Sequence, residues 1–195
     1  MNFFKKLFSI ATKEDDEIQK QEVFLSLDDL FVHNFIKKGG KFLYCLQKQE
    51  VEINLKNILT ENEWSEITIY NKNLASFIKN RNEICVLDNF HSKAPVFTTC
   101  EHLIADSGDL MFSSNQLKSN KLFALPENFI VYATTSQLVK NIGEGLTGIK
   151  INHRNKLPTN ISCIKNYTIQ KNDDNFLNYG NSNSKNLYLL LLEDL

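Results

Sequence analysis

The sequence has few cysteines and prolines and no large excess of either charge. Its four cysteines, Cys45, Cys85, Cys100 and Cys163, show no CxxC or CxxxC spacing, from which the common iron–sulfur and zinc sites draw their ligands. Each lies in or beside an expected strand, which suits small apolar core residues. The net charge of −1 gives no basic excess for binding nucleic acid. The sequence therefore predicts no metal site, no cofactor in this chain and no nucleic-acid partner.

Long apolar runs are also lacking. No run approaches the roughly twenty residues that span a bilayer, and the N-terminus has no apolar core of signal-peptide length. We therefore expect a cytoplasmic protein without a transmembrane segment. Residues 1–11 have apolar side chains at helical spacing opposite two lysines, and 1–20 are predicted as an amphipathic helix and linker. The helix either folds back on its own domain or frays, with docking on a membrane or partner as the alternative.

What the sequence does contain is an alternation of strands and helices over residues 21–195, which we predict to be a single domain. Expected strands lie at 41–46, 66–70, 84–87, 129–133, 162–170 and 187–192. Expected helices lie at 27–36, ended by Gly39-Gly40, at 51–59, at 73–78 and at 137–142, ended by Gly143 and Gly145. Residues 171–186 are expected to form an exposed loop. This order predicts an α/β fold with a mainly parallel sheet covered on both faces.

A hairpin is predicted in the middle of the chain. Two apolar triplets, 103–105 and 110–112, flank the turn Asp106-Ser107-Gly108-Asp109, so both strands should be buried on both faces. The turn amides and the Ser107 hydroxyl suit an anionic or hydroxylated ligand, and Gly108 would let a ligand approach the backbone. The alternative is a structural turn in which Asp106 bonds to its own backbone.

Other candidates for chemistry lie just before this hairpin. Glu101 and Asp106 are a possible acid–base pair of carboxylates, although an exposed glutamate without a role is the alternative. Cys100 as a nucleophile needs a base, and His102 is placed to project in a different direction, so we expect Cys100 to be buried. The four histidines, His33, His91, His102 and His153, have no metal-ligand spacing and are interpreted as isolated surface or core residues.

The order of motifs supplies a resemblance. A Thr-rich lead-in, then Ile104-Ala105-Asp106-Ser107-Gly108, a basic loop closing on Leu125-Pro126, and the strand Phe129-Ile130-Val131-Tyr132 together resemble the LUD domain, the lactate-utilisation protein C family. The resemblance implies a three-layer α/β/α sandwich of the NagB/RpiA/CoA transferase-like kind. Lys118 and Lys121 lie in the loop where the family typically has an arginine, and lysine holds a carboxylate or phosphate as a point charge.

The resemblance also implies a function. The chain is expected to be an accessory subunit of an iron–sulfur L-lactate-oxidising complex, with the clusters in partner subunits. It is expected to bind a small anionic metabolite through Glu101, Asp106, Ser107, Gly108 and Lys121. The alternatives are a stand-alone enzyme of the CoA-transferase, isomerase or folate-ligase type and a metabolite-sensing module.

Overall fold

The computed structural model describes residues 25–78, 84–89, 93–168 and 183–194. The helix and linker predicted for residues 1–20 lie outside these ranges. The loop predicted for residues 171–186 lies outside them as far as residue 182.

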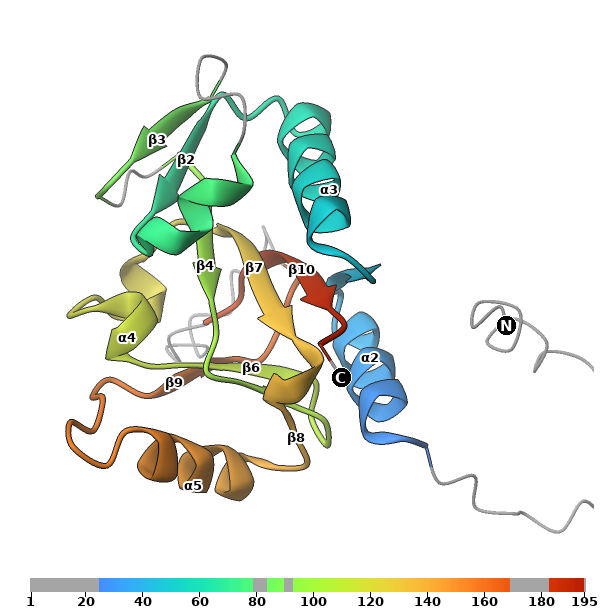
Figure 1. The fold of residues 1–195 in the computed structure, drawn as a ribbon, viewed down its shortest axis with the longest axis vertical. Coiled ribbons are helices and arrows are strands. Elements are labelled where there is room, and N and C mark those ends of the chain that lie inside the picture. Colours follow the sequence, from blue (N-terminus) through green and yellow to red (C-terminus); the bar gives the residue numbers. More distant parts are fainter. Residues whose placement is uncertain (1–24, 79–83, 90–92, 169–182, 195) are drawn as a thin grey trace, which may run out of the picture.

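A parallel sheet, six-stranded within the described ranges, forms the centre of the molecule (Figure 1). In spatial order its strands are β1 (Lys41–Cys45), β10 (Asn186–Leu192), β7 (Asn128–Thr134), β4 (Val96–Thr99), β2 (Glu66–Ile69) and β3 (Cys85–Leu87). Every neighbouring pair is parallel. The parallel sheet predicted from the alternation of strands and helices is confirmed.

The predicted hairpin forms part of a second, smaller sheet. Its strands are β8 (Leu138–Val139), β5 (His102–Ile104), β6 (Asp109–Phe112) and β9 (Ser162–Ile164), in that spatial order. The strands β5 and β6 pair antiparallel, and every residue of both is buried. Burial on both faces, as the apolar triplets predicted, follows because one face meets the main sheet and the other a helix.

Helices and the small sheet cover the two faces of the main sheet. On one face, α3 (Lys48–Glu61) and the 3-10 helix η1 (Lys72–Phe77) share a core with Ile130 of β7. On the other face, α2 (Leu27–Lys37) and the small sheet share a core with Phe129 and Val131. The helix α5 (Ile142–Asn152) covers the outer side of the small sheet (Figure 1). The protein has the α/β fold, in layers consistent with an α/β/α sandwich.

The helix α2 begins and ends where the sequence predicts. The Ser26 hydroxyl accepts a hydrogen bond from the Asp29 backbone N–H at 3.3 Å and caps the first turn. At the other end Gly39 has a φ of +88°, the left-handed conformation that favours glycine after a helix. Phe31 and Phe35 are fully buried and anchor the helix.

The helix predicted at residues 137–142 is wrong. Residues Thr135–Gln137 form the short 3-10 helix η3, β8 follows, and α5 then runs through the glycines that were expected to end a helix. A Cβ at Gly145 would lie 3.1 Å from Met111 Cε, and one at Gly148 would lie 2.7 Å from His102 Nε2. These glycines therefore bring α5 close to the small sheet and do not end it.

The strand predicted at residues 162–170 is shorter than expected. The strand β9 ends at Ile164, which pairs with Leu110 of the antiparallel strand β6. Because β6 begins at the hairpin turn, at Asp109, β9 has almost no further residues of β6 to pair with. Tyr167 then turns inward, and its hydroxyl donates to the Gly108 carbonyl at 2.6 Å. Residues 169–170 lie outside the described ranges. No helix in the described part of the chain is long and apolar enough to cross a bilayer.

Candidate functional site

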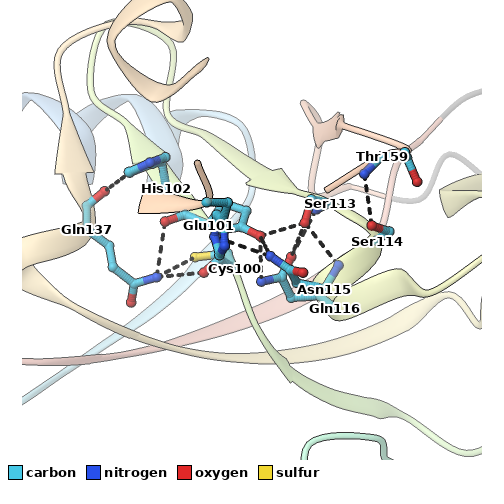
Figure 2. Close-up of polar contacts among 10 residues, drawn as sticks. Cys100, Glu101, His102, Ser113, Ser114, Asn115, Gln116, Gln137 and Thr159 are labelled. Carbon is cyan, nitrogen blue, oxygen red and sulfur yellow. Dashed lines mark hydrogen bonds and ion pairs between the residues drawn. The ribbon is translucent and has the colours of Figure 1, made fainter. Parts of the chain in front are cut away.

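A polar cluster lies where β4 leaves the main sheet. In a parallel sheet the carboxyl ends of all the strands lie on the same side, and ligands of open α/β sheets bind just beyond these carboxyl ends. After Thr99, at the end of β4, Cys100 and Glu101 lead directly into β5. Figure 2 shows the side chains that gather here.

Glu101 is the centre of this cluster. Its Oε1 accepts hydrogen bonds from Ser113 Oγ at 2.5 Å, Asn115 Nδ2 at 2.8 Å and Gln116 Nε2 at 3.1 Å (Figure 2). The three donors belong to the short helix α4 (Ser114–Leu117) and its N-cap. Because Ser113 and Gln116 form a capping box, the local sequence of α4 fixes the donors that surround the carboxylate.

His153 completes the cluster from a distant part of the chain. It is the C-cap of α5, and its Nε2 lies 3.7 Å from Glu101 Oε2 and 3.3 Å from Asn115 Nδ2. The side chain of His153 is 35% exposed, whereas that of Glu101 is 10% exposed. The interpretation of His153 as an isolated residue is therefore wrong, because folding brings it to Glu101.

The cluster keeps Glu101 ionised. Burial by itself would raise the pKa of the Glu101 carboxyl, but hydrogen bonds from Ser113, Asn115 and Gln116, with a smaller effect of His153, outweigh burial and lower the pKa. At neutral pH the side chain is a fixed negative charge with one oxygen, Oε1, held by three donors. The Oε2 atom of Glu101 can accept a hydrogen bond or contact a cation, and the negative charge of the carboxylate does not favour an anion.

The structure does not bring Glu101 and Asp106 together. They flank opposite ends of β5, and a strand rises about 3.3 Å per residue. Asp106 is exposed, while Glu101 has its own partners in α4. The predicted acid–base pair of carboxylates is therefore not formed.

The turn at residues 106–108 packs against α2. Asn34 Nδ2 donates to the Ala105 and Asp106 carbonyls at 2.9 and 3.2 Å. Gly108 has a φ of +68°, and a Cβ there would lie 2.5 Å from the Phe35 backbone nitrogen. The Ser107 hydroxyl is buried and has no hydrogen-bond partner among the described residues. A helix thus lies against Gly108, and the ligand role of Asp106, Ser107 and Gly108 stays a prediction.

The two lysines of the basic loop lie differently. Lys121 is exposed and its Nζ lies 5.8 Å from the centroid of the Phe123 ring. Lys118 Nζ lies 3.9 Å from the centroid of Tyr70, which follows β2 at the carboxyl edge of the main sheet. Of the two loop lysines, Lys118 is the one that lies at the carboxyl end of β2. The sequence gave no reason to choose Lys118 over Lys121 as the ligand-binding lysine.

The LUD domain family matches residues 29–192, from the first turn of α2 to the end of β10. The chain belongs to the LUD domain family. A crystal structure of a DUF162 family protein from Deinococcus radiodurans is similar to this chain, with a TM-score of 0.60 and 13% identity over 88% of this chain and 100% of that one. At that identity the likeness shows the fold alone. No curated protein matches the sequence.

The cysteines of this LUD domain do not fit an iron–sulfur cluster. Cys45 ends β1 and Cys85 begins β3, and these are the two edge strands of the main sheet, roughly 24 Å apart at about 4.8 Å per strand. Cys163 is in the other sheet. Cys85 is exposed, in contrast to the core position expected for it. Cys100 is buried as predicted, and burial raises the pKa of its thiol.

Proposed function

We propose that this LUD domain is an accessory subunit of an iron–sulfur L-lactate-oxidising complex and binds a small anionic metabolite for it. The observation that carries the proposal is the match to the LUD family. The matched region contains both sheets and the Glu101 cluster. In this proposal the redox clusters belong to partner subunits, since the four cysteines of this chain lie on separate parts of the fold.

In this proposal, acidic and basic side chains bind different groups of the ligand. Glu101 is anionic and suits a hydroxyl group, which donates a hydrogen bond to a carboxylate. An anionic group of the ligand is expected near Lys118 and Lys121, because a lysine holds a carboxylate as a point charge. Asp106, Ser107 and Gly108 complete the predicted ligand-binding set.

The first experiment is anaerobic purification of the tagged protein from its native cell. We expect iron-containing, brown subunits to accompany it, and the complex to reduce an artificial electron acceptor with L-lactate. The isolated chain should give no lactate-dependent reduction. Turnover by the pure chain would contradict the accessory role, and a colourless protein that purifies alone would favour the stand-alone enzyme or sensor.

Variants of the complex separate the ligand role from assembly. Glu101→Gln and the double change Lys118→Gln with Lys121→Gln should lower lactate-dependent reduction at least tenfold while the partners are retained. Lys150→Gln, an exposed lysine on α5, is the matched control and should leave the rate unchanged. Equal rates in all three variants would remove these residues from the site.

A further inference from the structure

The strand β1 is an edge of the main sheet, and no strand of the described ranges pairs with its outer side. On its inner side, the Glu193 N–H donates to the Cys45 carbonyl at 2.9 Å, as part of the pairing with β10. Successive residues of a strand direct their backbone groups to alternate sides, so Phe42 and Tyr44 direct their N–H and C=O groups away from β10. The strand therefore presents backbone donors and acceptors to a further strand.

The usual protection of a sheet edge is lacking at β1. Proteins commonly protect an edge with a proline, a bulge or a very short strand. The other edge strand, β3, has only three residues. In contrast, β1 has five residues without a proline and pairs with β10 in a continuous register, and Lys41 is its single charged residue. Tyr44 is 44% exposed, and Leu46, just after the strand, is 60% exposed. These features indicate a surface that binds a strand.

The charges at the two ends of β1 fit a second copy of the chain in antiparallel orientation. At the amino end are Lys37, the last residue of α2, and Lys41, whose Nζ donates to two neutral side chains. At the carboxyl end are Glu193 and Glu50, whose Oε2 accepts from the Leu46 N–H at 2.7 Å. The charged first and last residues of α3 reduce this difference without reversing it. Antiparallel pairing of two β1 strands therefore brings the basic end of each copy to the acidic end of the other.

We infer that two copies of the chain pair through β1 about a two-fold axis at Leu43. In this register Phe42 lies opposite Tyr44 of the second copy, and each such pair exchanges two backbone hydrogen bonds. The two Leu43 side chains meet on the opposite face, beside a groove of about 410 Å³ that Leu43 and Ile58 of α3 help to line. Because the joined strands run in opposite directions, the two Glu101 clusters lie on opposite sides of the continuous sheet.

The oligomeric state of the purified full-length chain is the first test. We expect sedimentation equilibrium at micromolar concentrations to give twice the mass of the chain. Tyr44→Pro removes the outward N–H and leaves the bonds to β10 in place, so it should weaken the dimer at least tenfold. Tyr44→Val is the matched control, because it keeps the N–H in a strand-forming residue and should weaken the dimer less. Far-UV circular dichroism checks that each variant is folded.

Cross-linking tests the register, in a Cys85→Ser background that removes the exposed thiol. The Leu43 Cα atoms of the two copies should lie about 4.5 Å apart, within the range of a disulfide, so Leu43→Cys should cross-link on mild oxidation. Tyr44→Cys is the control. Its two copies are offset by two residues along the strands, which places their Cα atoms roughly 8 Å apart, beyond the reach of a disulfide.

The outcomes do not depend on lactate oxidation, since both tests use the chain alone. A dimer that Tyr44→Pro dissociates and that Leu43→Cys cross-links supports the proposal. A chain that stays monomeric at hundreds of micromolar overturns it and leaves the edge to an extended segment of another protein. A dimer that Tyr44→Pro leaves intact, or equal cross-linking of Leu43→Cys and Tyr44→Cys, also overturns it. If Tyr44→Pro does not fold, the cross-linking decides by itself.

Discussion

At the scale of single residues, Gly108 is the most constrained position of the hairpin turn. Its φ of +68° strains any other residue, and a Cβ would lie 2.6 Å from the Asn34 carbonyl carbon. We expect Gly108→Ala to lower the free energy of unfolding by about 2–4 kcal/mol, from backbone strain and overpacking together. Urea denaturation measures the change.

The neighbouring residue provides the control. The Ser107 hydroxyl is buried without a partner in the described part of the chain, so removing it costs no hydrogen bond there. Ser107→Ala should be neutral or slightly stabilising. A loss for Ser107→Ala as large as for Gly108→Ala would show that the hydroxyl has a role that the packing does not explain.

The buried residue Lys185 is expected to make the stability of the protein depend on pH. Burial lowers the pKa of its ammonium group from 10.5 to about 8, while Nζ donates to the Leu125 carbonyl at 2.8 Å. Between about pH 8 and pH 10.5 the unfolded chain keeps this proton and the folded chain loses it, so the stability contribution of Lys185 rises with pH.

The measurement compares the wild type with Lys185→Met. The difference in unfolding free energy should shift in favour of the wild type by about 1–3 kcal/mol as pH rises through this window. Taking the difference removes the opposing effect of buried tyrosines and thiols, which both proteins share. A difference that is constant with pH would mean that Lys185 stays charged when folded.

At the scale of elements, the glycines of α5 adjust the distance between the helix and the small sheet. A Cβ at Gly148 would meet the buried ring of His102 at 2.7 Å. Gly148→Ala gains up to about 1 kcal/mol of helix propensity but costs about 1–3 kcal/mol of overpacking, so we expect a net loss near 1 kcal/mol. Thermal denaturation measures it.

Gly143→Ala tests the same exchange with a longer contact, to one side chain. Gly143 is exposed in the first turn of α5, and its Cβ would meet only the Asn141 side chain at 3.1 Å. This variant should be neutral or stabilised by up to about 1 kcal/mol. If Gly148→Ala were also stabilised, close packing would not be the reason for glycine there.

These glycines also show where reading the sequence succeeds and fails. Gly39 ended α2 as expected because its signal is local: a left-handed residue after an amphipathic helix. Gly143 and Gly145 were misread as helix ends because glycine is also found inside helices, and the close packing of Gly145 depends on Met111 and Ile104 of the small sheet. Most of the strands and the mainly parallel sheet were predictable from the alternation of apolar strands with helices, whereas β4 and β8 were not predicted.

The candidate site was only half predictable for the same reason. Glu101 was found beside the hairpin, but its partners come from α4 and from the end of α5. His153 reaches Glu101 only through the packing of α5 on the small sheet, which no spacing records. The packing of Gly108 against α2 could likewise not be predicted, because α2 is remote in sequence.

At the scale of the whole molecule, the two sheets share one core. Phe112 of β6 and Phe129 of β7 are both fully buried, and their ring centroids lie 6.3 Å apart. Because apolar burial dominates folding free energy, unfolding of the small sheet would remove the core from one face of the main sheet. The shared core therefore predicts that the described part of the chain unfolds as one cooperative unit.

Unfolding in urea tests this with two probes on opposite sides of the main sheet. Trp64, the single tryptophan, packs edge-on against Tyr188 in the core on the α3 side. Cys100 is buried with the small sheet, and its labelling by a thiol reagent is resolved by mass spectrometry. We expect the Trp64 fluorescence and Cys100 labelling transitions to share one midpoint. Labelling of Cys100 at lower urea would show that the small sheet opens first, exposing the Glu101 cluster while the main sheet stays folded.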